Sequence, residues 1–532
     1  MHRVSDPVPT PTPASRRWLA MPFIALGVAM IIVDATIVNV AVPSIIRTLH
    51  LTATTAEWLN SIYALVFAAL LIPAGRLGDR WGRRRLFLLG TIVFVAASLV
   101  AATAGSGSVL VLGRFLQGIG GAMVLPATLS TVNALFSGHE RAVAFAIWGS
   151  TIGGVAALGP LVGGWLTTDF SWRWAFFVNV PVGVLIVTGV VLFIPETSQP
   201  ESARGADLAG NALATLGFAA VVAALIEGAR YGWWRAVSPL GIGGLHWPSG
   251  WISPIPVAIV VGLVSLGAFV VVERARGRSD RPVLVDLSLF SIRSFSAGNL
   301  AILVVSLGEF GVLFVLPLFL QGVRGYSAFG TGTILLALAG GTLLAGGLTP
   351  QLARRISARG VARLGLALET IGLALLALVI GPRVGGWTLV PGLLVYGLGI
   401  GMATAQLTGV ILADVPIAQS GAASGVQSTV RQVGSALGIA IIGTVYVVEI
   451  GRRTLAGLAR VPGLSGPARD AIAAAVRASG GAVVHSLAPG PVTAAAAAAV
   501  AGATRLDAGL AALFILIGLV ATFRLPRQIP PT

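Results

Sequence analysis

The sequence predicts an all-α polytopic membrane protein. Of its 532 residues, 56% are hydrophobic and only 10% are charged, and the mean hydropathy is +0.91. Soluble globular proteins carry about 25% charged residues, so this chain could not cover a water-facing surface. Its apolar runs are continuous rather than alternating, which favours spanning helices over the strands of a β-barrel.

Fourteen apolar runs are long enough to cross a bilayer, since about 20 residues suffice for a helix. Polar or charged segments separate them and would form the loops. The predicted spans are residues 18–41, 57–75, 86–104, 109–134, 142–166, 174–194, 208–228, 254–273, 296–320, 327–349, 362–381, 388–413, 422–447 and 500–523.

One charged segment, residues 75–86, sets the orientation that we expect in the membrane. It places five arginines and Asp79 between two apolar runs. Such a segment is most simply a tight cytoplasmic turn, because arginine-rich loops are retained on that side. Alternating the spans from this turn puts most arginines and both termini in the cytoplasm. We therefore expect a multi-pass protein of the inner, cytoplasmic membrane.

A weak internal repeat divides the chain into two halves. Residues 350–359 align with the charged segment 75–86, although the aspartate is replaced by Arg354. A parallel repeat of two six-span bundles explains this spacing. The predicted organisation is a disordered cytoplasmic N-terminus (1–17), an N-terminal bundle (18–195), linkers with two inserted spans (196–294), a C-terminal bundle (295–524) and a cytoplasmic tail (525–532).

Two long loops are expected at the outer side. Residues 230–254 are rich in Trp, Gly and Pro, and a segment at about 450–499 is rich in Ala, Gly and Pro. We interpret both as flexible spacers, although residues 467–478 could form a surface helix.

Composition excludes several kinds of function. The net charge of +16 comes from arginine alone, since the chain has no lysine. This charge is better explained by membrane topology and lipid headgroups than by nucleic acid. The absence of cysteine excludes disulfides and thiolate metal sites. The five histidines are scattered, so we expect no metal, no cofactor and no enzymatic activity.

Among the charged residues that fall inside predicted spans, we single out four candidates: Asp34, Arg114, Glu309 and Arg431. A charge at the bilayer centre costs at least ~2.5–3.5 kcal/mol, so each is a functional hypothesis. Asp34 and Arg114 would lie at similar depths, about 10 Å and about 7 Å from the outer edge. We expect Asp34 to carry a proton and Arg114 to be its partner or gate. The alternative is a permanent ion pair that only locks two helices.

Glu309 is open to three interpretations. It could be a second proton site, a counter-ion for a cationic substrate, or a structural partner of Arg431. Other polar residues in the spans are candidates for a substrate cavity, with interhelical hydrogen bonding, packing or interface anchoring as the alternative. These candidates are Asn39, Asn60, Tyr63, Gln117, Trp148, Gln321, Gln406, Gln427 and Arg431.

The fifth predicted span is rich in glycine. Small residues four apart let helices approach closely, and a proline bends a helix. Gly159, Pro160, Gly163 and Gly164 therefore indicate a hinge in a helix that rocks, although tight packing alone would explain them too.

Six motifs along the chain resemble those of one family, the major facilitator superfamily, and its fourteen-span drug:proton antiporter branch. The motifs are GRLGDRWGRR (75–84) of the cytoplasmic loop, LGRFLQGIG (112–120) of the fourth span, GGVAALGPLVGG (153–164) of the fifth-span antiporter motif, DATIVNVAVP (34–43) of the first span, WRWAFFVNVPVG (172–183) of the sixth-span entry and GAASGVQSTVRQVG (421–434) of the second half.

The resemblance implies a major facilitator fold of two six-helix bundles plus two inserted spans. It also implies proton-coupled export of hydrophobic or cationic drugs by alternating access, with antibiotic resistance as the outcome. A dedicated exporter of one endogenous metabolite or lipid is the alternative. In this family context, Gly75, Asp79, Arg80, Gly82 and Arg83 would act as a cytoplasmic latch. The expected partners are protons, lipophilic or cationic small molecules and membrane lipids.

Overall fold

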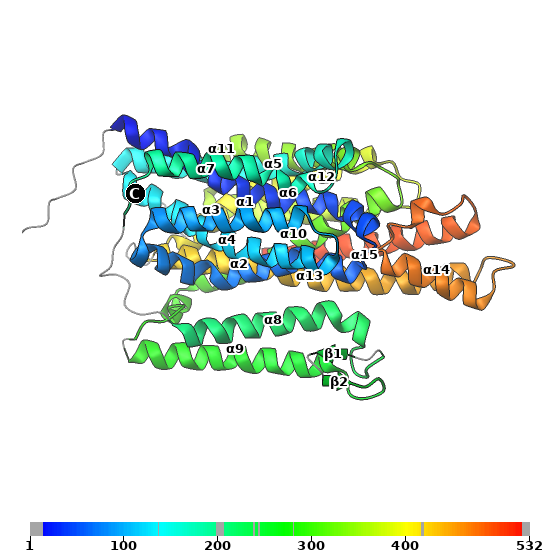
Figure 1. Cartoon of the computed structure of the whole chain (residues 1–532). Coiled ribbons are helices and arrows are strands. Elements are labelled where there is room, and N and C mark those ends of the chain that lie inside the picture. Colours follow the sequence, from blue (N-terminus) through cyan, green and yellow to red (C-terminus); the bar gives the residue numbers. More distant parts are fainter. Residues whose placement is uncertain are drawn as a thin grey trace, which may run out of the picture.

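Long helices that lie side by side make up almost all of the structure (Figure 1). The computed structural model describes residues 14–136, 138–197, 207–237, 240–242, 245–279, 281–416 and 420–523. The predicted segment 1–17 lies mostly outside these residues, and the predicted tail 525–532 lies wholly outside them. Residues 14–17 are helical rather than disordered, because the first helix already begins at Ala14.

The first half of the chain forms antiparallel helices with short connections. Thr52 and Ser106 accept hydrogen bonds from backbone N–H groups three residues later, so each ends a turn and starts a helix. Gly82 has φ +120° and separates two helices without a loop. The helices are α1 (Ala14–Leu49), α2 (Ala53–Trp81), α3 (Arg83–Ala102), α4 (Gly107–Leu135), α5 (Gly138–Asp169), α6 (Trp174–Phe177) and α7 (Asn179–Phe193).

A helical hairpin is inserted between the halves. It consists of α8 (Leu208–Tyr231) and α9 (Pro254–Arg278), and the strands β1 (Leu240–Ile242) and β2 (Leu245–Trp247) pair antiparallel at its tip. Figure 1 shows the hairpin along one side of the other helices. Trp58 of α2 donates to Glu227 at 2.9 Å, and Thr444 donates to the Leu225 carbonyl at 2.7 Å. The hairpin is therefore hydrogen-bonded to both halves of the chain.

The second half begins with a short 3-10 helix and continues in long helices. The break in the longest one falls at Ser357, where φ is +66°. The elements are η2 (Leu287–Ser291), α10 (Arg293–Gly322), α11 (Ala328–Val379), η3 (Gly386–Leu389), α12 (Val390–Leu412), α13 (Ser420–Leu458), α14 (Gly466–Ala478), η5 (Val484–Ser486) and α15 (Pro491–Thr522).

Consecutive long helices alternate in direction, so the bundle has two ends. We name them the Gly82 end, where α1 begins, and the Leu49 end, where α1 finishes. The strands and α14 lie at the Leu49 end (Figure 1). The two halves meet where α2 contacts α13, α5 contacts α11 and α1 contacts α10.

The prediction of many membrane-spanning helices is confirmed, but the predicted number of fourteen is not. Within the described residues, thirteen helical segments are long and apolar enough to cross a membrane. Spans ten and eleven are both present inside α11, on either side of its break at Ser357. The helix α5 corresponds to the fifth predicted span but is not among the thirteen. The number fourteen therefore stays a prediction.

The interpretation of 450–499 as a flexible spacer was wrong, and its alternative, a surface helix at 467–478, is confirmed by α14. The supposed loop at about 450–499 is mostly helical, because α13 continues to Leu458 and α15 already starts at Pro491. Between them α14 is amphipathic and begins at the N-cap Ser465, whose hydroxyl accepts from the Ala468 N–H. The supposed loop 230–254 contains the hairpin of β1 and β2.

Candidate functional site

A polar cluster is buried inside the N-terminal half, surrounded by α1, α3, α4 and α7. At its centre Asp34 and Arg114 form an ion pair at 2.5 Å, and their side chains are 0% and 1% exposed. The sequence placed these residues at similar depth, and the structure brings them into contact. Their helices contact each other directly.

Three side chains donate to the Asp34 carboxylate. Arg114 occupies one oxygen, while Gln117 and Asn179 donate to the other at 2.9 and 2.8 Å. Both amides also donate to the Ser98 hydroxyl, at 2.8 and 3.1 Å. The carboxylate is thus held by charge-assisted hydrogen bonds from two other helices, α4 and α7.

Arg114 is also held from the side of α2. Its Nε donates to the Leu59 carbonyl at 3.0 Å, and its guanidinium lies 4.2 Å from the ring centre of Tyr63. The Tyr63 hydroxyl is buried and has no hydrogen-bond partner among the described residues. The Arg114 guanidinium therefore links α1, α2 and α4, so a change in the charge of Asp34 would alter contacts between all three helices.

Three candidate cavity residues of the N-terminal half form hydrogen bonds between helices. Asn60 of α2 donates to Asn39 of α1 at 2.9 Å, and Trp148 of α5 donates to Thr128 at 3.2 Å. These contacts are interhelical hydrogen bonds, the alternative that the sequence left open for polar residues in the spans.

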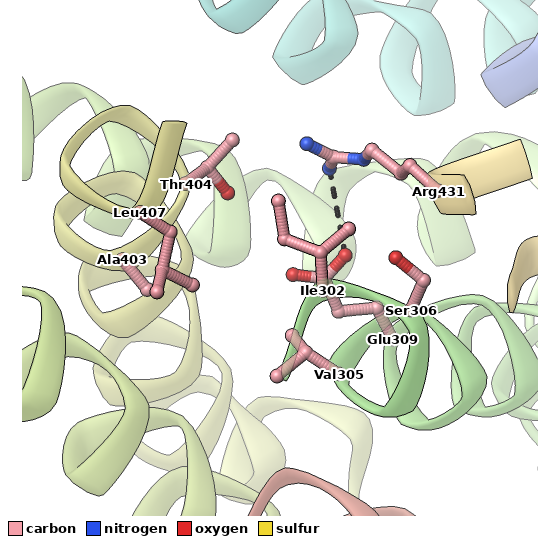
Figure 2. Close-up of a pocket in the computed structure, with 8 residues that line it drawn as sticks. All are labelled: Ile302, Val305, Ser306, Glu309, Ala403, Thr404, Leu407 and Arg431. Carbon is pink, nitrogen blue, oxygen red and sulfur yellow. Dashed lines mark hydrogen bonds and ion pairs between the residues drawn. The ribbon is translucent and has the colours of Figure 1, made fainter. Parts of the chain in front are cut away.

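A second charged pair lies in the C-terminal half. Glu309 of α10 and Arg431 of α13 are 3.4 Å apart, with side chains 6% and 36% exposed. Figure 2 shows the pair at the edge of a pocket between α10, α12 and α13. The pocket is lined by Ile302, Val305, Ser306, Glu309, Ala403, Thr404, Leu407 and Arg431.

Three glutamine candidates lie outside this lining. Gln427 donates to Thr408 at 2.7 Å, which joins α13 to α12, and Gln406 is half-buried on α12. Gln321 is buried at the Leu49 end and donates to the Val40 carbonyl at 2.8 Å. It therefore joins α10 to α1 across the two halves.

The charged segment 75–86 contains the end of α2 and the start of α3. The Glu196 carboxylate, just beyond α7, accepts from the backbone N–H groups of Arg84 and Arg85, each at 3.2 Å. It caps the first turn of α3, where a negative charge is favourable. A Cβ added to Gly82 would lie 2.5 Å from this carboxylate, so glycine is needed there for both space and backbone angle.

The other predicted latch residues have different surroundings. Arg83 is buried, and its backbone N–H donates to the Thr197 carbonyl at 3.0 Å. Gly75 is half-buried and Arg80 is exposed. The side chain of Asp79 lies outside the part of the chain that the structure describes.

The predicted hinge glycines lie where α5 approaches its neighbours most closely. A Cβ on Gly163 would be 3.0 Å from Ile37 of α1, and one on Gly164 would be 2.5 Å from the Ala328 carbonyl oxygen of α11. A Cβ on Gly159 would collide with Thr36 at 1.8 Å. The carbonyl of Pro160 in turn lies against Gly332 of α11. These contacts lie toward the Leu49 end, where α5 joins the two halves.

Sequence reasoning missed three residues at these sites as functional candidates. Asn179 lies in the motif at 172–183, but nothing in its spacing indicated that it bonds to Asp34. Ser98 is one of many serines in apolar spans. Glu196 follows the sixth span in a charged linker, and nothing in the sequence indicated that it caps α3.

The sequence of the chain matches the family model described as "Major Facilitator Superfamily" over residues 24–233 and 200–439. The chain belongs to the Major Facilitator Superfamily. This assignment agrees with the resemblance of its motifs and with the helical, membrane-spanning fold. It makes the chain a multi-pass membrane protein of a transporter family.

Curated relatives match most of the chain. It is 33% identical to the "Probable actinorhodin transporter" of Streptomyces coelicolor, over 84% of this chain and 75% of that protein. It is 34% identical to the "Puromycin resistance protein pur8" of Streptomyces alboniger, over 81% and 82%. It is also 34% identical to the "Multidrug efflux pump LfrA" of Mycolicibacterium smegmatis, over 83% and 82%.

A solved structure supports the fold. A bacterial homolog of the human lysosomal transporter Spinster, in an inward-facing and unoccupied conformation, superposes with a TM-score of 0.62. The superposition covers 98% of this chain and all of that chain, at 18% sequence identity. At this identity the likeness concerns the fold alone.

Proposed function

We propose that this protein is a proton-coupled antiporter that exports hydrophobic or cationic drugs across the cytoplasmic membrane by alternating access. The observation that carries the proposal is the buried ion pair of Asp34 and Arg114. A fully buried carboxylate is costly unless it is paired, and such residues in membrane helices mark proton or substrate pathways. The relatives named as efflux and resistance proteins support export rather than uptake.

In this proposal the Gly82 end faces the cytoplasm, because the arginines of the segment 75–86 lie there. We take the structure as an inward-facing state, because its two halves are joined at the opposite, outer end. The two halves are joined at the Leu49 end, where Phe329 of α11 donates from its N–H to Thr168 of α5 at 2.8 Å. Gln321 and Val40 add a second contact at the same end.

In the proposed transport cycle, a proton and Arg114 compete for the Asp34 carboxylate. When the protein opens outward, a proton binds Asp34 and weakens its attraction to Arg114. The arginine, which also contacts α2 and α4, can then shift, and the helices around it rearrange as the substrate leaves. Return to the inward-facing state restores the ion pair and delivers the proton to the cytoplasm.

The segment around Gly82 would act as the inner latch in this cycle. Asp79 and the neighbouring arginines hold the halves together on the cytoplasmic side in the outward-open state. Glu196 supports the latch because it positions the start of α3. Glu309 is proposed as a further proton-coupling residue, since it lines the pocket in Figure 2 beside Arg431.

A dedicated exporter of one endogenous metabolite is the second candidate. The relative named as a probable actinorhodin transporter favours it, because that name concerns a single compound. The same buried pair and latch would serve such an exporter. Substrate breadth is the property that separates the two candidates.

Purified protein in vesicles with a pyranine-filled interior tests the proposal. Added substrate should drive proton movement across the membrane, and an imposed pH gradient should drive accumulation of a lipophilic cation such as ethidium. Transport that ignores the pH gradient would overturn proton coupling. A panel of unrelated lipophilic compounds then decides between multidrug and dedicated export, since only the former moves many of them.

A further inference from the structure

A carboxylate that the sequence did not single out lies deep in the C-terminal half. Glu369, on the part of α11 that follows the break at Ser357, is 0% exposed. Neither of its carboxylate oxygens has a hydrogen-bond partner among the described residues. An ionised carboxylate in this position would be buried without compensation, which costs several kcal/mol.

The surroundings of Glu369 contain few charged groups. It packs on α12, where a Cβ added to Gly399 would lie 2.6 Å from its Cγ. It is within electrostatic reach of Glu309 on α10 and Arg431 on α13. Tyr396 of α12 is within reach of the same charges, and its buried hydroxyl also has no partner in the described part of the chain.

These groups do not balance in charge. Two carboxylates, Glu309 and Glu369, lie within electrostatic reach of a single guanidinium, that of Arg431. Arg431 touches Glu309 through one nitrogen at 3.4 Å and leaves Glu369 unpaired. Two carboxylates that share one site cannot both ionise without a large cost, so such a pair holds one proton.

From this geometry we infer that Glu309, Glu369 and Arg431 form a second proton-binding site, in which the two carboxylates share one proton and Arg431 pairs with whichever is ionised. Glu309 lines the pocket and Glu369 does not (Figure 2). Glu309 is therefore the member that exchanges protons with water, and Glu369 is the sealed member that stores one.

The position of Arg431 makes an exchange feasible. Its side chain is 36% exposed and its contact with Glu309 is long, so the guanidinium is not locked in place. If Arg431 turns toward Glu369, the proton passes to Glu309 at the pocket and can leave. The inference deepens the proposed function, since it adds a proton site in the half opposite Asp34.

Infrared spectroscopy of purified protein tests the site without any transport. At neutral pH the wild type should show the carbonyl stretch of a protonated carboxylic acid, and Glu369→Gln should remove its share of that band. An unchanged carbonyl band in Glu369→Gln would overturn the inference. This readout stands even if the wild type moves no substrate, so failure of the site and failure of the proposed function are distinguishable.

Proton counting tests whether the site takes part in coupling. Glu369→Gln and Glu309→Gln should each reduce the protons released on substrate binding by about one, and the double variant should lose no more than either single variant. The inference of a shared proton would be overturned if the losses of the two single variants added up in the double variant. It would also be overturned if both single variants released as many protons as the wild type. If Glu369→Gln fails to fold, Glu309→Gln alone decides, because it should also lose that proton.

Asp507→Asn is the matched control. Asp507 of α15 is also fully buried with both oxygens unpaired among the described residues, but it lies outside this cluster. Its replacement removes a buried carboxyl and should leave substrate-linked proton release unchanged. An equal loss in Asp507→Asn would show that burial of a carboxyl, rather than this site, sets proton release, and would overturn the inference.

Discussion

Asp34 on α1 and Arg114 on α4 form an ion pair at 2.5 Å, and neither side chain is more than 1% exposed. Gln117 and Asn179 donate to the same carboxylate, so four helix-borne side chains converge on one point. A pair so deeply buried either stabilises the fold or switches during transport. Variants that separate stability from transport can tell these roles apart.

Asp34→Asn should abolish proton-coupled efflux while the protein still reaches the membrane. It should also lower the free energy of unfolding by about 3–5 kcal/mol, because Arg114 is left buried without its counter-charge. The measurements are pH-jump transport in vesicles and thermal unfolding in detergent. Asp414→Asn, at an exposed aspartate, is the control and should match the wild type.

The double variant Asp34→Asn/Arg114→Gln separates the two roles. Removing both charges should recover much of the lost stability, because no unpaired charge remains buried. Transport should stay absent if Asp34 carries the proton. Efflux that returns in the double variant would show that the pair only locks the helices together.

Asn179→Leu should move the pH dependence of transport to higher pH. The ionised Asp34 loses a charge-assisted hydrogen bond worth about 1.5–3 kcal/mol, which favours its protonated form. The midpoint of substrate-linked proton release against pH measures this shift. Asn211→Leu, on α8 and away from the pair, should leave the midpoint where it is; a shift to lower pH in Asn179→Leu would contradict the geometry.

Gly164→Ala should open the Leu49 end. The added methyl would lie 2.5 Å from the Ala328 carbonyl oxygen, and such overpacking destabilises the packed state by about 1–3 kcal/mol. The equilibrium should therefore shift about 5- to 150-fold away from the state described here. Because the chain has no cysteine, spin labels on cysteines introduced at Phe170 and Phe329 report the separation directly.

Gly340→Ala is the control for this variant. A Cβ on Gly340, also on α11, meets nothing within 4 Å, so the label distances should not change. Equal distances in Gly164→Ala and the wild type would mean that α5 and α11 absorb the methyl without separating.

Glu196→Ala should slow transport through the latch segment. It removes the cap of α3 and an exposed ion pair with Arg85 at 3.7 Å, a loss of about 1–2 kcal/mol in unfolding free energy. Turnover should fall while the substrate Kd stays within about twofold, since the cap lies far from the buried pair. Glu140→Ala removes a comparable surface ion pair with Arg17, at 3.6 Å, and should turn over normally.

Asp79→Asn should likewise slow turnover more than it weakens substrate binding. Asp79 belongs to the same segment, and its role rests on the sequence motif. Turnover rates in vesicles and substrate binding in detergent check the two quantities separately. Unchanged turnover in this variant would count against a latch at the Gly82 end.

The sequence predicted that Asp34 and Arg114 lie at a similar depth without showing that they are partners. One residue advances 1.5 Å along a helix, so position in a span predicts that Asp34 and Arg114 lie at a similar level. It does not predict which way each side chain points or which helices are neighbours. Asn179 and Ser98 were missed for this reason, because they reach Asp34 only through the packing of α7 and α3 against α1 and α4.

Glu369 is a residue whose lack of a partner the sequence did not reveal. Its span was predicted, but a single glutamate in it gave no sign of being unpaired. Only the packing of α10, α11, α12 and α13 places Glu369 near Glu309 and Arg431 without a hydrogen-bond partner among the described residues. The small residues of 450–499 led us to favour a flexible spacer, but the alternative of a surface helix at 467–478 is what forms, as the capped amphipathic α14.

By itself the sequence determined that the chain is an all-α membrane protein of the major facilitator type, and which buried charges needed explanation. Hydropathy is summed residue by residue along the chain, so it can be read without knowing the fold. Only the tertiary structure decided which charges meet, which glycines touch and which carboxylate is left alone. Helices in lipid are selected by close packing and polar contacts rather than by hydrophobicity, and those contacts join residues far apart in the sequence.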